Sequence, residues 1–240
     1  MAFAPSFLLI ALILGKGEPY KMNGLFITFE GNDGSGKTTL ANMLYQYLKD
    51  NGYDVIFTRE PGGCPIAEEI RKVILDKNNV GMSSVAETLL YAASRAQHVQ
   101  DVIAPSLNSG KIVISDRYVD SSYAYQGFGR ELGFKVVKEI NDIATGGCMP
   151  DLTFLIDVDL ETALGRRKAS SFTDRLDDEE IEFHKRNYLG FCQLAKAFPD
   201  RIKCINGNQS LDIIHKHVCY IVDNLLKERG ILSGYTSRTE

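Results

Sequence analysis

A glycine-rich segment near the start of the chain has the residue types needed to bind a phosphate chain. It reads Gly31-Asn32-Asp33-Gly34-Ser35-Gly36-Lys37-Thr38, fits the pattern G-x-x-x-x-G-K-[ST], and lies between an apolar run and a helix-forming segment that begins at Thr39. Its glycines let backbone N–H groups approach phosphate oxygens, and the start of a helix adds partial positive charge. We expect Lys37 to reach the β and γ phosphates of a nucleotide and the Thr38 hydroxyl to bind magnesium. The alternative, which the flanking strand and helix disfavour, is a flexible glycine turn.

A carboxylate and an arginine follow a second apolar run, residues 111–115. Asp116, at the carboxyl end of this expected strand, is placed as a Walker B residue that holds magnesium directly or through water. Its alternative role is to cap the next helix. Arg117 comes next, and a guanidinium at the ligand edge of a sheet needs a partner, for which a phosphate is well suited.

Two further segments carry side chains that could act on a substrate. Tyr91 and Arg95 are four residues apart on an expected helix, so their side chains should lie together; an aromatic residue on a helix can equally belong to the core. Residues 169–178 are polar and resemble a mobile lid. Arg175, with Arg166 and Arg167 before it, could neutralise a transferring phosphoryl group and exclude water. The alternative is a solvated loop with ordinary surface charges.

Strand-like and helical stretches alternate from Leu25 onward, which is typical of a parallel sheet covered by helices. The expected strands are residues 25–30, 54–58, 111–116, 152–157 and 201–206. The expected helices are residues 39–49, 66–76, 83–107, 160–168, 179–198 and 211–227. The fold class is therefore α/β, with a five-stranded parallel sheet that places the phosphate-binding segment and Asp116 at its carboxyl edge.

Composition excludes several classes of protein. The chain has 240 residues, 44% of them hydrophobic, enough for one large domain. Its net charge of −4 gives no broad basic surface, so we expect no nucleic-acid partner. The five cysteines include no C-x-x-C pair and suggest neither a disulfide framework nor a zinc site. A reducing compartment, the cytoplasm, fits best.

The N-terminal segment is apolar but does not have the features of an anchor. Residues 2–14 resemble the apolar region of a signal peptide, yet no Lys or Arg precedes Phe7 and no clear cleavage site follows. About 13 residues are too few to span a bilayer as a helix, so we expect no membrane association. Our hypothesis is that residues 1–21 are dispensable to the fold. Residues 22–240 then form a single domain, with a lid at about residues 166–178.

Several segments outside the phosphate-binding segment agree with one family pattern. They are Phe29-Glu30-Gly31, Thr58-Arg59-Glu60-Pro61-Gly62-Gly63, Ala92-Ala93-Ser94-Arg95, Asp116-Arg117-Tyr118, Asp120-Ser121-Ser122-x-Ala124-Tyr125-Gln126-Gly127, Pro150-Asp151-Leu152-Thr153 and Asp174-Arg175-Leu176. Over about residues 24–228 the chain resembles the bacterial thymidylate kinases, which phosphorylate dTMP with ATP to give dTDP. The resemblance implies the three-layer P-loop NTPase fold, Mg²⁺ as cofactor, and a homodimer packed through helices.

The resemblance also assigns roles on the dTMP side. The residues it places there are Asp33, Arg59, Glu60, Arg71, Tyr91, Arg95, Arg117, Ser121, Tyr125 and Gln126. Tyr91 would stack on thymine, while Arg95 and Gln126 would hydrogen-bond the base. The three other arginines of the set would surround the dTMP phosphate. Asp33 would contact the sugar 3′-hydroxyl, and Tyr125 would close the site to a ribose 2′-hydroxyl.

On the ATP side the resemblance leaves one choice open. Some members of the family have an arginine at the position of Gly34, and others supply that charge from the lid, so the lid arrangement is implied here. Residues 169–173, however, lack the arginine that similar bacterial sequences usually carry. Arg166, Arg167 and Arg175 therefore all stay candidates for the contact with ATP. The catalytic candidates are Lys37, Asp33, Arg117 and Arg175, and the expected metal ligands are Thr38 and Asp116.

Two rival functions share the phosphate-binding segment. One is a kinase for another nucleoside monophosphate, such as CMP, UMP or AMP; Arg95, Tyr125 and Gln126 favour thymidylate. The other is a nucleotide-binding switch or regulatory ATPase without a second substrate. The sequence has no N-K-x-D segment, which argues against a GTPase, and an arginine-rich acceptor side would have no role in a simple switch.

Overall fold

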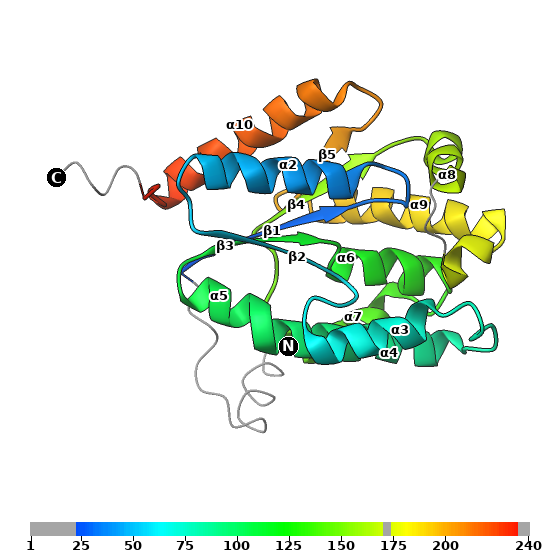
Figure 1. Cartoon of the computed structure of the whole chain (residues 1–240). Coiled ribbons are helices and arrows are strands. Elements are labelled where there is room, and N and C mark those ends of the chain that lie inside the picture. The colour runs from blue at the N-terminus through cyan, green and yellow to red at the C-terminus, as the bar shows by residue number, and fades with distance from the viewer. Residues whose placement is uncertain (1–22, 170–173, 235–240) are drawn as a thin grey trace, which may run out of the picture.

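The computed structural model describes residues 23–169 and 174–234, and its centre is a five-stranded parallel sheet (Figure 1). The strands are β1 (Leu25–Glu30), β2 (Val55–Arg59), β3 (Ile112–Asp116), β4 (Leu152–Asp157) and β5 (Ile202–Asn206). Their order across the sheet is β2-β3-β1-β4-β5. All five strands were expected within one residue of these bounds, and the α/β fold class is confirmed.

Helices cover both faces of the sheet. They are α2 (Lys37–Asp50), α3 (Pro65–Leu75), α4 (Ser84–His98), α5 (Ala104–Asn108), α6 (Val119–Ser122), α7 (Phe134–Thr145), α8 (Leu160–Lys168), α9 (Ile181–Ala197) and α10 (Leu211–Arg229). Figure 1 shows α2 and α10 on one side of the sheet and α3, α4, α5 and α7 on the other. The result is the three-layer arrangement implied by the resemblance.

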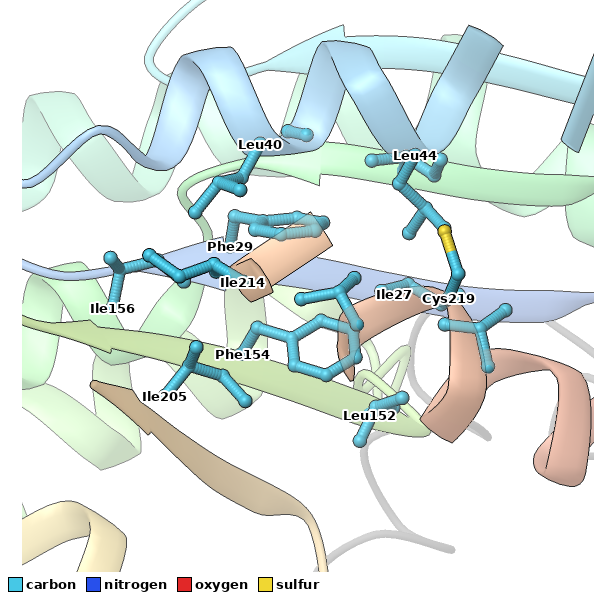
Figure 2. Close-up of a cluster of buried hydrophobic side chains, with 14 of the residues drawn as sticks. Ile27, Phe29, Leu40, Leu44, Leu152, Phe154, Ile156, Ile205, Ile214 and Cys219 are labelled. Carbon is cyan, nitrogen blue, oxygen red and sulfur yellow. The ribbon is translucent and has the colours of Figure 1, made fainter. Parts of the chain in front are cut away.

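Successive side chains of β1 point to opposite faces of the sheet, so this strand contributes to both hydrophobic clusters. Leu25, Ile27 and Phe29 pack into the cluster under α2 and α10, whereas Phe26 between them packs into the cluster on the opposite face. Figure 2 shows Ile27 and Phe29 beside side chains from α2 and α10. Because both faces are covered, the strand is apolar at four of its six positions and buried at all six.

Two expectations about helices need correction. The single helix expected over residues 83–107 is divided by a π-helical turn, η1 (Val99–Ile103), and α5 then begins with Pro105 in its first turn, where a missing N–H costs little. The segment from α6 through the π-helical η2 (Tyr123–Gly129) to α7 had not been assigned. Among the described residues, no helix is long and apolar enough to cross a membrane. Residues 1–21 and 170–173 lie outside the described residues, so the hypothesis that 1–21 are dispensable stays a prediction.

Strand order sets the position of the site. β1 lies between β3 and β4, and Phe29 of β1 is in register with Asp116 of β3, which is in turn in register with Arg59 of β2. The carboxyl ends of these parallel strands therefore meet at one edge. The loops that follow β1, β2 and β3 all open onto that edge, where ligands of open α/β sheets bind.

Candidate active site

A cavity of about 260 Å³ lies at this edge. The predicted site residues that line it are Asp33, Lys37, Thr38, Arg59, Glu60, Arg71, Tyr91, Arg95, Asp116, Arg117, Ser121, Tyr125, Gln126 and Arg167. Residues expected on the ATP side and on the dTMP side thus share one cavity. Gly31, Asn32, Gly34, Ser35, Gly36 and Thr39 belong to the adjoining loop and the first turn of α2.

The phosphate loop, residues 31–38, presents unpaired donors. Helix α2 starts at Lys37 with Gly36 before it and no side-chain cap, so its first N–H groups stay available to an anion. Within the described part of the chain, Asn32 Nδ2 and Ser35 Oγ are buried without a hydrogen-bond partner. Buried donors of this kind are costly unless a ligand or water satisfies them. A phosphate chain in the loop would do so.

Gly34 has a steric role in this loop. Its φ is +84°, and a Cβ placed there would lie 2.1 Å from the carbonyl oxygen of Ala163 and 3.1 Å from the backbone nitrogen of Arg167, both in α8. A residue with a side chain would therefore be strained and would collide with α8. The loop is packed directly against the helix that carries Arg167.

An ion-pair cluster connects the phosphate loop to the segment after β3. Asp33 Oδ1 accepts a hydrogen bond from Arg117 Nη2 at 2.7 Å and lies 3.3 Å from Lys37 Nζ. Asp33 Oδ2 accepts one from the Tyr125 hydroxyl at 3.1 Å. Removal from bulk water favours the neutral carboxyl, but the charges of Arg117 and then Lys37 outweigh it and hold the pKa of Asp33 well below its usual range. Asp33 is therefore ionised at neutral pH.

The backbone aims Arg117 into the cavity. Its φ is +72°, an uncommon conformation for a residue with a side chain. Nη1 donates to Ser121 Oγ at 2.7 Å, and the guanidinium lies over the Tyr125 ring at 5.2 Å from its centre. Ser121 Oγ in turn donates to Glu30 Oε2 at 2.6 Å. These contacts fix a permanent positive charge beside the phosphate loop.

Thr38 and Asp116 form a pair suited to magnesium. Thr38 Oγ1 donates to Asp116 Oδ2 at 2.5 Å, and Asp116 Oδ1 is buried without a hydrogen-bond partner among the described residues. No cluster of three or more His, Cys, Asp or Glu side chains suited to a metal occurs in the part of the chain described. Magnesium does not require one, because it binds through one or two protein oxygens together with phosphates and water. The pair therefore fits this ion.

Two further arginines, Arg59 and Arg71, line the same cavity. Arg59 Nη1 and Arg71 Nη1 both donate to the carbonyl oxygen of Pro61, at 2.9 and 2.8 Å, and Arg59 also pairs with Glu68 at 3.0 Å. Burial and then the neighbouring charge of Arg59 lower the pKa of Arg71. Two guanidiniums held this close, with Arg117 nearby, favour a bound dianion such as a phosphate monoester.

The arginine expected to read a base is already fully engaged. Arg95 is 2% exposed, and its five N–H donors meet Glu60, Ser122, Asn141 and the carbonyl oxygen of Tyr118. Contact with a base would require one of these bonds to be exchanged, so the base-reading role of Arg95 stays a prediction. Glu60, expected on the substrate side, is likewise occupied. Its carboxylate holds Arg95 through Oε2 and His98 Nδ1 through Oε1 at 3.0 Å.

The three lid arginines occupy different surroundings. Arg167 lines the cavity and pairs with Asp177 at 2.6 Å and Asp174 at 3.2 Å. Arg166 is exposed on α8. Arg175 begins the 3-10 turn η3 (Arg175–Asp178), is buried, and pairs with Glu87 at 2.5 Å instead of lining the cavity. In this structure Arg167 lines the cavity and Arg175 does not. The catalytic role expected of Arg175 therefore stays a prediction, with Arg167 the better placed of the two.

Two buried carboxylates around the site had been given no role. Glu30 accepts the Tyr118 backbone N–H at 2.7 Å and the Ser121 hydroxyl. Glu87 accepts bonds from Gln126, Arg130 and Arg175. Glu30 is part of one of the family segments, and Glu87 precedes Tyr91 by one helical turn, so both positions carried a signal. Their partners are distant in sequence and could not be named from it.

The site and the fold can be compared with known proteins. A family model for thymidylate kinase matches residues 29–218. The chain belongs to the thymidylate kinase family. It is 49% identical to the thymidylate kinase of Halothermothrix orenii over 208 residues, which cover 85% of this chain and 99% of that protein. The thymidylate kinase of Acholeplasma laidlawii is 49% identical over 205 residues, with 85% and 99% covered.

A solved thymidylate kinase structure, from Ehrlichia chaffeensis, aligns with a TM-score of 0.68 at 35% identity and covers 83% of this chain and 98% of that one. The matched range contains every predicted site residue, from Gly31 to Arg175. The thymidylate kinase resemblance inferred from separated motifs is thus confirmed at the level of the family and the fold.

Proposed function

We propose that this chain transfers the γ-phosphoryl group of ATP to dTMP, giving dTDP and ADP, in the cavity at the carboxyl edge of the sheet. The observation that carries this is the gathering of two groups of cations in one cavity. The phosphate loop lines it through Lys37, and a second group lines it too, made of Arg59, Arg71 and Arg117. A switch protein needs the first group only, whereas a phosphotransferase needs both.

The donor half of the site would hold ATP through the phosphate loop. Lys37 would neutralise the β and γ phosphates, and Arg167 would add charge from the lid side. Thr38 and Asp116 would hold Mg²⁺, which would supply positive charge against the phosphates. Asp33 keeps Lys37 and Arg117 oriented through the ion pairs already described, and so links the two halves.

The acceptor half would hold dTMP with its phosphate among Arg59, Arg71 and Arg117. The attacking oxygen belongs to a phosphate that is already ionised, so no side-chain base is required. The protein contributes position and charge, which in phosphoryl transfer supply most of the catalysis. Tyr91 and Gln126 line the same cavity and would face the base, and Tyr125, held by Asp33, would lie at the sugar.

We also infer a homodimer that uses the helical layer on the α3 side of the sheet. Helices α3, α4 and α7 pack side by side on that face (Figure 1). They expose Ile66, Val73, Val85, Leu89 and Ile143, with 46 to 62% of each residue accessible. Apolar side chains gathered on adjacent helices are typical of an interface between subunits. The free cysteines of the described residues support a reducing compartment such as the cytoplasm.

A coupled assay of ADP release tests the reaction directly. Purified protein with ATP and Mg²⁺ is given dTMP, dUMP, dCMP, CMP and AMP in turn, and dTMP should give the highest kcat/KM. Thermal shift separates a kinase from a switch, because dTMP alone should raise Tm by binding the folded state. An absence of ADP release that depends on dTMP would refute the proposal, and so would a higher kcat/KM for AMP or dCMP.

A further inference from the structure

Glu87 is a wholly buried carboxylate between the expected base-binding end of the cavity and the lid. It lies in α4, one turn before Tyr91, and is 0% exposed. Its Oε1 accepts a hydrogen bond from Gln126 Nε2 at 2.9 Å and one from Arg130 Nε at 3.1 Å. Its Oε2 accepts from Arg130 Nη2 at 2.9 Å and from Arg175 Nη2 at 2.5 Å. Both oxygens are thus saturated with donors.

These partners keep Glu87 charged. Burial alone would raise its pKa, but the hydrogen bonds and charge of Arg130, with those of Gln126 and Arg175, lower it below the usual value. An ionised carboxylate carries no hydrogen and can only accept. Every polar group that hydrogen-bonds Glu87 must therefore present a donor to it.

This requirement determines which way the amide of Gln126 faces. Its Nε2 must lie toward Glu87, because the opposite orientation would place Oε1 against a negatively charged oxygen in a buried site. Gln126 also lines the cavity. The carbonyl oxygen Oε1 lies on the other side of the amide and is free of this constraint. We propose that Glu87 is a positioning residue for base specificity, which fixes Gln126 so that a pyrimidine in the cavity meets a hydrogen-bond acceptor.

A hydrogen-bond acceptor at this position distinguishes pyrimidines by whether their N3 atom carries a hydrogen. Thymine and uracil carry a hydrogen on N3 and can donate it to Gln126 Oε1. Neutral cytosine has a lone pair on N3, which would face the lone pairs of Oε1. A buried polar group that faces the wrong partner is costly, so such a site rejects cytosine strongly. The inference rests on the proposed function, since it takes dTMP as the acceptor substrate, and adds the residue that sets the choice.

The chain supplies a matched control in Glu179. Arg130 Nη2 pairs with Glu179 Oε1 at 2.6 Å as well as with Glu87. Among the contacts of the described residues, Gln126 and Arg175 bond to Glu87 and not to Glu179. Glu179→Gln therefore removes a carboxylate from the same arginine and leaves the amide of Gln126 fixed.

The test is the ratio of kcat/KM for dTMP to that for dCMP, measured on wild type, Glu87→Gln and Glu179→Gln. A glutamine at position 87 can donate as well as accept, so the side-chain amide of Gln126 could rotate and exchange its oxygen and nitrogen positions. The ratio should fall about tenfold or more in Glu87→Gln, mainly through a lower KM for dCMP, and should stay within about twofold of wild type in Glu179→Gln. The ratio of dTMP to dUMP should not change, because both bases donate from N3.

Partial unfolding of a variant cannot produce the expected result, and a second variant tests the same role. Both substrates are assayed on the same preparation, so the ratio does not depend on the folded fraction. Glu87→Asp keeps the charge beside Arg130 and Arg175 but withdraws it from Gln126 by one methylene, and should also lower the dTMP to dCMP ratio. An unchanged ratio in both Glu87 variants, or an equal fall in Glu179→Gln, would overturn the role of Glu87. A wild-type enzyme that does not prefer dTMP over dCMP would instead refute the proposed function.

Discussion

Glu30 should make the stability of this protein fall as the pH rises through neutrality. The residue ends β1 directly before the phosphate loop and is fully buried. Burial, and then the nearby charge of Asp120, raise its pKa from 4.5 to about 8, although Arg117 opposes the change. Its two oxygens accept the Tyr118 N–H and the Ser121 hydroxyl, so the group is held in place and cannot turn toward water.

The sign and size follow from proton linkage. In the unfolded chain Glu30 loses its proton near pH 4.5, and in the folded protein it does so near pH 8. Between these values the folded state holds one more proton, so the free energy of unfolding falls as the pH rises, by up to about 1.4 kcal/mol per pH unit. The whole effect is about 5 kcal/mol. This loss of stability is absent below the pKa of Glu30 in the unfolded chain and complete above its pKa in the folded protein.

Glu30→Gln isolates this effect because the amide cannot ionise. Urea unfolding of ligand-free protein at pH 5, 6, 7, 8 and 9 gives the free energy of unfolding for both proteins. The wild-type value minus the variant value should fall by several kcal/mol across the series. Glu182→Gln changes an exposed carboxylate that pairs with Lys185, and should follow wild type at every pH. A difference between wild type and Glu30→Gln that is the same at all five pH values would refute the reasoning.

Three further substitutions test the donor side. Lys37→Ala should lower kcat by roughly 10² to 10³, because it removes a preorganised charge from the phosphate loop; steady-state turnover measures this. Arg167→Ala should lower kcat with little change in the Kd of dTMP, whereas Arg166→Ala, which removes an exposed charge, should change neither. Gly34→Ala should lower Tm strongly, since its Cβ would meet the backbone of α8 at 2.1 Å, while Gly165→Ala, which has open space on α8, should not.

Each of these expectations has a contrary result. Near-normal turnover in Lys37→Ala would refute the catalytic role of the phosphate loop. A larger loss of kcat in Arg166→Ala than in Arg167→Ala would show that α8 presents its other arginine to ATP. Equal Tm values for the two glycine variants would mean that α8 is free to move away from the loop.

The sheet and the phosphate loop could be predicted because their signals are local. Buried parallel strands are continuous apolar runs, and the loop is a fixed pattern of glycines, a lysine and a threonine. The π-helical segment Tyr123–Gly129 was missed because it is rich in tyrosine and glycine and has no helical period of apolar residues. Helix α7 does have apolar residues at helical spacing, and was nevertheless left unassigned.

Prediction of the site was limited mainly because the sequence does not show which charged residues pair with each other. Arg95 and Arg175 were both expected to face substrates, since their charge and their helical or lid context are visible in the sequence. What the sequence could not give is the carboxylate that each one meets, which lies 35 residues away for Arg95 and 88 residues away for Arg175. Only the folded arrangement of α4, β2 and η3 brings those pairs together. Arg167, which lines the cavity, was among the candidates but could not be separated from its neighbour Arg166.

The contact of Gly34 with α8 also constrains how such a site can evolve. A side chain at position 34 would have to displace the backbone at Ala163 and Arg167, and would move the lid arginine with it. A cation built into the phosphate loop at this position and a cation delivered by α8 in its present place therefore exclude each other. A lineage that exchanges one source of charge for the other must change both segments. An evolutionary intermediate with only the substitution at position 34 would displace the cation on α8 before the cation in the loop could be positioned.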